Sequence, residues 1–110
     1  DSMTRAQVDE LHELKRQETK LRIAIKRSEK KHMTGERYAS MIEQREALLQ
    51  QMKPLRDQLF SEIKDSLAAE YSRLYYGGMT SYQIADLFGY RSGETITAKI
   101  KEAERQVTGS

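Results

Sequence analysis

Cysteine and tryptophan are absent from this 110-residue chain, and proline occurs only once. Without cysteine the chain can form neither a disulfide nor a thiolate-ligated metal site. It has no apolar stretch near the roughly 18 residues that a membrane span requires, and no signal-peptide pattern opens it. We therefore expect a soluble cytoplasmic protein with no membrane partner.

The usual sequence patterns of catalysis are missing as well. There is no glycine-rich phosphate loop, no nucleophile elbow, and no acid pair with an enclosing pocket. The two histidines, His12 and His32, lie 20 residues apart without a cluster of further ligands. We expect no enzyme, no metal site and no cofactor, which directs attention to binding functions.

Charged residues make up 33% of the chain and hydrophobic residues 37%, a balance that suits long exposed helices better than a compact α/β core. The charge is unevenly distributed. Residues 1–35 contain nine Lys or Arg against six Asp or Glu, whereas residues 77–110 contain four of each. The neutral C-terminal part weighs against nucleic-acid binding, because phosphate neutralisation usually supplies most of the affinity.

A first long helix is predicted near the N-terminus. Thr4-Arg5-Ala6-Gln7 fits a capping box, in which the two polar side chains satisfy free amides at the helix start. The helix should run to about His32, where Met33-Thr34-Gly35 breaks it. Thr34 is the expected cap of the helix that follows.

The second helix is expected from Glu36 to about Tyr76, where Gly77-Gly78 stops it. Pro54 lies inside this range. Because proline removes one backbone hydrogen bond and clashes with the preceding turn, it predicts a kink or division near Met52-Lys53.

Apolar positions on the two helices match when the chain folds back at Thr34-Gly35. The matched pairs are Leu21 with Leu48, Leu14 with Leu55, and Leu11 with Leu59. This register predicts a long antiparallel helical hairpin, coiled-coil-like, over residues 1–62. Charged or polar side chains occupy four seam positions that should be apolar, namely Glu18, Ser28, His32 and Arg45.

A second apolar stripe runs along the same hairpin, through Val8, Ile23, Ile42, Leu49 and Phe60. Two isolated helices cannot bury both stripes, so a partner is needed, and a second copy of the chain is the simplest one. We expect a homodimer built on residues 1–62. A monomeric hairpin with scattered exposed apolar residues remains the alternative.

Residues 63–110 are expected to form a separate head of three short helices. The first carries an apolar face through Ile63, Leu67, Tyr71 and Leu74, and the second begins with a capping box at Thr80-Ser81-Tyr82-Gln83. The third starts after Ser92 and carries Ile96, Ile100 and Ala103 on one face. Core packing best explains the aromatic set of Tyr71, Tyr75, Tyr76, Tyr82 and Tyr90.

Within this head, Gln83-Ile84-Ala85 and Phe88-Gly89-Tyr90 resemble the helix-turn-helix DNA-binding proteins, in particular small regulators of bacteria, phages and mobile elements. The resemblance covers about 25 of the 110 residues. It implies that Ala85 lets two helices approach closely, and that Gly89 takes a positive φ in the turn. Two departures are visible: the turn from Gly89 to Ile96 is one residue longer than usual, and the long helices precede the head.

Helical geometry nominates the DNA contacts. With Ile96 facing the core and about 100° per residue, one side of the last helix points outward. Recognition helices read bases mainly with their N-terminal part, so the candidates for base edges are Arg91, Ser92, Glu94, Thr95 and Ala98. The candidates for phosphates are Lys99, Lys101 and Arg105 from this helix, with Ser81 and Tyr82 from the preceding helix start. The alternative is an ordinary solvated face, with Glu102 and Arg105 forming a surface pair.

The sequence thus predicts an all-α, dimeric protein that binds duplex DNA in a sequence-dependent way, as a bacterial or phage regulator of transcription or replication does. A protein-binding adaptor or inhibitor acting through the hairpin, similar to an antirepressor, is the main alternative, because residues 77–110 carry no net charge. A phage DNA-packaging component is the third.

Overall fold

The computed structural model describes residues 1–109, and over these residues the chain is all-helical with no strand. The five helices are α1 (Arg5–Lys30), α2 (Glu36–Glu62), α3 (Ser66–Tyr76), α4 (Ser81–Phe88) and α5 (Gly93–Thr108). The expectation of an all-α protein is confirmed.

Side-chain caps start three of the helices where the sequence predicts them. At α1, the amide of Gln7 donates to Thr4 Oγ1 at 3.2 Å, and the amide of Thr4 donates to Gln7 Oε1 at 2.9 Å. Thr80 and Gln83 repeat this capping box at α4, with both bonds at 2.9 Å. At α5, Ser92 Oγ accepts from the amide of Glu94 at 3.1 Å.

The start of α2 departs from prediction. Gly35, not Thr34, is the N-cap residue, and no side chain caps this end of the helix. The expected role of Thr34 was therefore wrong. Gly35 lies in an exposed turn, so water can satisfy the free amides that a threonine hydroxyl would otherwise bind.

The predicted helix from Glu36 to Tyr76 is also wrong, because α2 ends at Glu62 and α3 starts at Ser66. The division occurs at Ile63–Asp65, not near Pro54, through which α2 continues. Pro54 leaves the carbonyl of Gln50 without its helical partner, and both residues are exposed, so water can bind there.

Two local features explain the break between α2 and α3. Ile63 turns inward and is only 8% exposed. Asp65 then caps α3, where its Oδ1 accepts from the amides of Leu67 and Ala68 at 2.9 and 3.1 Å. A buried apolar residue followed by an aspartate cap thus redirects the chain more effectively than the proline does.

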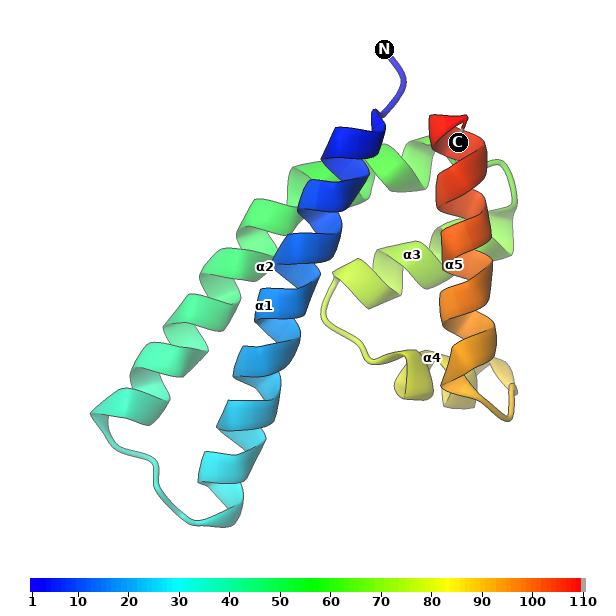
Figure 1. Ribbon diagram of the computed structural model, residues 1–110. Coiled ribbons are helices and arrows are strands. Elements are labelled where there is room, and N and C mark those ends of the chain that lie inside the picture. The colour runs from blue at the N-terminus through cyan, green and yellow to red at the C-terminus, as the bar shows by residue number, and fades with distance from the viewer. Residues whose placement is uncertain (110) are drawn as a thin grey trace.

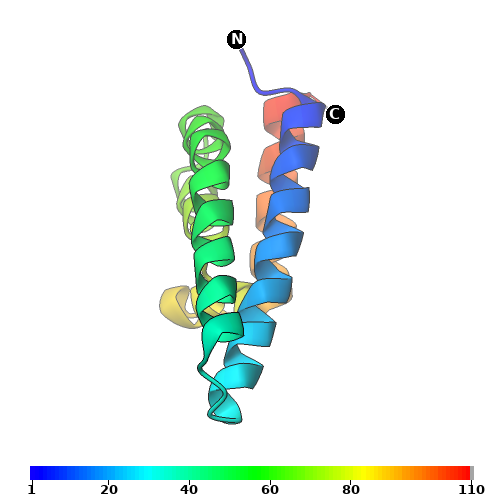
Figure 2. The ribbon, with the colours of Figure 1, turned by 90° about the vertical axis from the view of Figure 1, so that its left-hand side faces the viewer.

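The helices assemble into a flat body with extents of 45 × 32 × 17 Å. α1 and α2 run side by side in opposite directions, and α5 occupies the same layer as α1 while α3 passes behind (Figures 1 and 2). α4 lies beside the start of α5, away from the two termini, and the turn between α1 and α2 extends farther in the same direction (Figure 1). The last helix therefore stands beside the first, with a space between them that side chains line.

One hydrophobic core runs through both predicted segments. Fully buried residues of α1 and α2, such as Leu11 and Met52, belong to the same cluster as Ile84 and Ile96. The division into residues 1–62 and 63–110 stays a prediction. In this packing, residues 63–109 cover apolar surface of residues 1–62.

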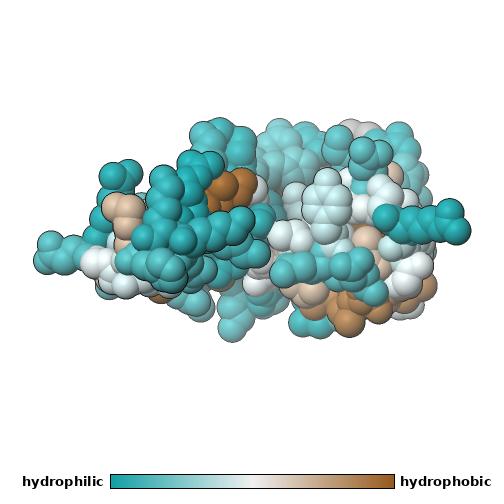
Figure 3. Space-filling model, turned by 90° about the horizontal axis from the view of Figure 1, so that it is seen from below, coloured by the Kyte–Doolittle hydropathy of each residue, from teal (hydrophilic) through white to brown (hydrophobic). Residues whose placement is uncertain are grey.

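This packing also accounts for part of the second apolar stripe. Val8 is fully buried, and Leu49 packs against the core. Ile23, Ile42 and Phe60 remain 48%, 39% and 39% exposed. The end of the molecule seen from below is largely hydrophilic, with apolar atoms in small separate patches (Figure 3). The homodimer stays a prediction, with a smaller apolar surface to support it than the sequence suggested.

Two of the polar seam residues belong to a buried ionic cluster of Lys15, Glu18 and Arg45. Glu18 is fully buried and Lys15 is 3% exposed, and their charged atoms lie 3.0 Å apart. Arg45 Nε donates to the other oxygen of Glu18 at 2.8 Å. Burial alone would raise the pKa of Glu18, but Lys15 and Arg45 hold it below its ordinary value.

The same cluster fixes the connection between α3 and α4. Lys15 Nζ donates to the carbonyls of Tyr75 and Met79 at 2.7 and 3.2 Å. Arg45 donates to the carbonyl of Gly78 at 3.3 Å. Charges at the seam between α1 and α2 therefore hold the loop that leads into α4.

Candidate nucleic-acid interface

The turn between α4 and α5 depends on Gly89. This residue ends α4 with φ 80° and ψ 23°, so the predicted positive φ is confirmed. The amide of Tyr90 then donates to the carbonyl of Ala85 at 2.8 Å, which closes the end of α4. In this left-handed conformation a residue with a Cβ would lower the stability of the fold by about 1 kcal/mol.

The sides of α4 and α5 that face each other are buried. Ala85 is 2% exposed and Ile96 is fully buried, as expected of the residues between the two helices. The ring of Phe88 meets that of Tyr71 edge-on at 4.9 Å. Tyr71 donates its hydroxyl hydrogen to Tyr90 Oη at 3.1 Å, and burial together with this contact raises the pKa of Tyr71 to about 12.

Tyr82 was wrongly placed in this aromatic set. Its side chain is 71% exposed and lies on the outside of α4. Tyr82 lies two residues before the buried Ile84 on α4, which is about 200° around the helix, so its side chain points away from the core.

The two helices approach closely at Gly93, a residue that was not predicted to lie at this contact. A Cβ built on Gly93 would lie 2.7 Å from Ser81 Oγ and 3.2 Å from the backbone nitrogen of Tyr82. A sequence signal for this contact exists: Gly93 is the first residue of α5, although alanine would favour a helix more than glycine does. The missing side chain brings the start of α4 against the start of α5.

This close contact gives a stability prediction. Alanine normally favours a helix over glycine by about 1 kcal/mol. We expect Gly93→Ala instead to lower the free energy of unfolding by about 1 kcal/mol, because overpacking outweighs the helix preference. Urea denaturation of both proteins measures the difference.

A double variant checks the cause. Ser81→Ala removes the oxygen that lies nearest the new methyl group, so it should recover part of the loss in the Gly93→Ala background. An increase in stability for Gly93→Ala alone would show that the two helix starts are not in tight contact.

The predicted contact residues all lie on α4, on α5 or in the turn between them. Most are exposed, namely Tyr82, Arg91, Glu94, Ala98, Lys99, Lys101 and Arg105, while Ser81, Ser92 and Thr95 are partly buried. The approach at Gly93 brings Ser81 and Tyr82 beside the N-terminal turn of α5. The hydroxyl oxygen of Ser92 already accepts the capping bond from Glu94.

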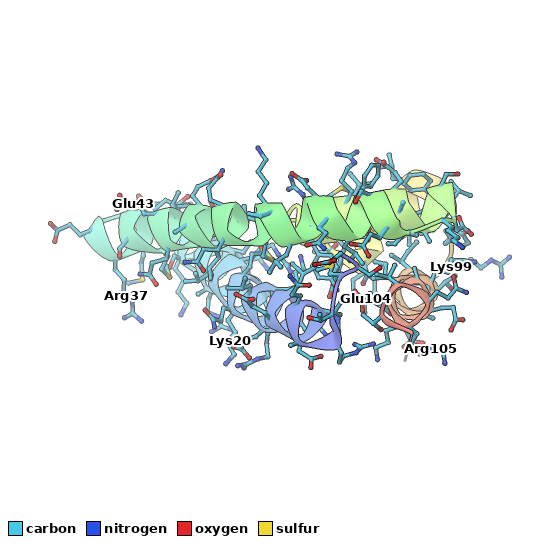
Figure 4. The ribbon with its side chains drawn as sticks, turned by 90° about the horizontal axis from the view of Figure 1, so that it is seen from above. Lys20, Arg37, Glu43, Lys99, Glu104 and Arg105 are labelled. Atoms are coloured by element: carbon cyan, nitrogen blue, oxygen red, sulfur yellow. The ribbon has the colours of Figure 1, made fainter. Side chains whose placement is uncertain are left out.

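The three phosphate contacts that were predicted on α5 do not share one surface. The amine of Lys99 lies 5.9 Å from the centre of the Tyr90 ring, and its side chain points away from Arg105 (Figure 4). Lys101 lies on the opposite flank and lines a groove against α1. Arg105 pairs with Glu102, the surface pair that the sequence left open as an alternative.

Residues 1–109 contain no group of three or more His, Cys, Asp or Glu side chains that could hold a metal ion. None of the helices in this range is long and apolar enough to cross a membrane. Comparison with known proteins gives no match to a family model, a curated protein or a solved structure.

Proposed function

We propose that this protein binds duplex DNA in a sequence-dependent way, with α3, α4 and α5 as a helix-turn-helix head and α5 as its recognition helix. The observation that carries the proposal is the free outer side of α5. One side of this helix packs in the core through Ile96, Ile100 and Ala103, while Arg91, Glu94 and Ala98 are exposed. A helix held in this way can enter a major groove.

The roles follow from position along α5. Arg91, at the helix entrance, binds guanine, Glu94 accepts from cytosine, and Ala98 or the methyl group of Thr95 contacts thymine. Phosphates are bound by Lys99, Lys101 and Arg105 on the flanks, and by Ser81 and Tyr82 at the start of α4.

α1 can supply the positive charge that residues 77–110 lack. Lys20, on α1, and Arg105, on α5, point to the same side of the molecule (Figure 4). Lys20 is exposed and has no ion-pair partner among residues 1–109. A duplex on the outer side of α5 would then receive phosphate contacts from α1, so the positive charge that the head lacks is supplied by the N-terminal segment.

The antiparallel pair of α1 and α2 is, in this proposal, the dimerisation hairpin. A homodimer presents two copies of α5 to a two-part DNA site. By resemblance, the protein is a bacterial or phage regulator of transcription or replication. Ile23, Ile42 and Phe60 are the exposed apolar residues available for such an interface.

Salt dependence tests the proposal. With about six phosphate contacts, affinity for a 25-base-pair duplex should fall about 10³-fold between 50 and 200 mM salt. Fluorescence anisotropy with a labelled duplex measures this slope. No measurable binding at the lower salt concentration, or an affinity that salt leaves unchanged, would contradict DNA binding.

The neutral charge of residues 77–110 supports one second candidate, a protein-binding adaptor that acts through α1 and α2. Such a protein would show no salt-sensitive affinity for duplex DNA. A DNA-packaging component would instead form a large ring in solution, which light scattering distinguishes from a dimer.

A further inference from the structure

A groove of about 410 Å³ lies between α1 and α5, with the C-terminal end of α3 as its floor. Tyr75 and Tyr76 come from α3, Thr97 and Ile100 from α5, and Thr19 from α1. This volume is within the range of sites for small organic molecules. The walls are largely apolar, so a ligand bound there would bury an apolar part of its surface away from water.

A buried network fixes one wall of the groove. Glu104 is only 1% exposed. Its Oε2 accepts a hydrogen bond from the Tyr76 hydroxyl at 2.5 Å, and its Oε1 forms a hydrogen bond with His12 Nε2 at 2.8 Å. Burial, and next the charge of Glu104, raises the pKa of Tyr76 well above its ordinary value, so the phenol keeps its proton. Both oxygens of Glu104 already have hydrogen-bond partners, so this carboxylate is not free to accept a further hydrogen bond from a ligand in the groove.

The rim of the groove carries two lysines without ion-pair partners among residues 1–109. Lys20 projects from α1 and Lys101 from α5, so they face the groove from opposite sides. The other cations at this site are already engaged: Lys15 with Glu18, and Arg16 with Glu13. The rim is therefore positive at the two points where a bound molecule would meet solvent.

We propose that this groove binds a small organic anion with an apolar, planar body, such as an aryl carboxylate. The ring lies against Tyr75, Tyr76 and Ile100, and the carboxylate accepts hydrogen bonds from Lys20 and Lys101. A charged acceptor opposite an ammonium forms a stronger bond than a neutral one, so charge is the main source of selectivity. The proposal does not depend on DNA binding, because it concerns the free protein.

The test is an NMR titration of the full chain with 2-naphthoate and, as a neutral match of the same shape, 2-naphthamide. We expect saturable shifts of the Thr19, Tyr75, Thr97 and Ile100 amides. Naphthoate should bind at least about tenfold more tightly than the amide. Equal affinities, absence of saturation, or shifts centred elsewhere would overturn the proposal.

Substitutions give the second readout. Lys20→Met combined with Lys101→Met keeps the side-chain stems and removes the charges, so naphthoate affinity should fall to that of naphthamide. Lys53→Met, at an exposed position on α2, is the matched control and should leave the affinity unchanged. Unchanged naphthoate affinity in the Lys20/Lys101 double variant would contradict the assignment of the anion site.

A third variant guards against a purely electrostatic effect. Thr97→Phe adds a ring inside the groove and should abolish the shifts for both probes, while circular dichroism confirms that the variant remains folded. Dilution of the ligand-free protein is the last control. If dilution alone shifts the same four amides, a second copy of the chain covers the groove, and the small-molecule proposal fails.

Discussion

Glu18→Gln is expected to lower the free energy of unfolding by about 3 kcal/mol, because it leaves Lys15 buried without a charge partner. Glu18 is fully buried, and its two oxygens lie 3.0 Å from Lys15 Nζ and 2.8 Å from Arg45 Nε. Loss of this carboxylate also frees the loop at Gly78, which Arg45 holds. Urea denaturation of the variant and the parent protein measures the loss.

Glu13→Gln is the matched control, since Glu13 lies on the same helix and pairs with Arg16. Its side chain is 48% exposed, so the pair is screened by water and its loss should lower the stability far less than the loss of the Glu18 carboxylate does. Similar losses for the two variants would show that burial of the Glu18 cluster contributes nothing beyond an ordinary surface pair.

Acid provides an independent check on the same cluster. The folded pKa of Glu18 lies below its ordinary value of 4.5, so its contribution is fully present above pH 4.5 and is lost as the pH falls below that value. Glu13, Glu70 and Glu102 also have lowered pKa values beside arginines, so the parent protein has other acid-sensitive groups. The Glu18→Gln variant should therefore lose less stability between pH 5 and pH 3 than the parent.

Arg91→Ala should weaken binding to a preferred duplex by about 10- to 100-fold, because a bidentate contact with guanine contributes about 1–3 kcal/mol of discrimination. Arg91 is exposed where the chain enters α5. Fluorescence anisotropy with the preferred duplex, and with the same duplex changed at one guanine, measures the effect. The variant should also discriminate less between these two duplexes.

Arg37→Ala serves as the control, because Arg37 is exposed at the far end of α2 from α5 (Figure 4). Its loss should leave the affinity for both duplexes nearly unchanged. If Arg37→Ala weakens binding as much as Arg91→Ala does, the contacts are with phosphates over the whole surface, and the assignment of Arg91 to a base is wrong.

The sequence predicted features that depend on neighbouring residues. Both capping boxes and the cap at Ser92 lie where the pattern placed them. Gly89 also takes the expected positive φ. Each of these is decided within about four residues, where a polar side chain or a missing Cβ acts directly on the local backbone.

Features that depend on distant residues were not predictable. Glu18 and Arg45 looked like defects in an apolar seam. Only the folded chain shows that Glu18 accepts a hydrogen bond from Arg45, and that Arg45 in turn donates to the carbonyl of Gly78 before α4. In the same way, Glu104 is buried because His12 and Tyr76, far away in sequence, supply its partners. The break at Ile63 was missed because Pro54 is the stronger local signal, although burial of Ile63 decides the path of the chain.

Selection of bound duplexes from a random pool tests the central claim most directly. If the free side of α5 reads bases, several rounds at moderate salt should enrich one short motif, and the Arg91→Ala variant should lose preference at a single position within it. Recovery of random sequences by the parent protein, or enrichment of an identical motif by Arg91→Ala, would contradict the account.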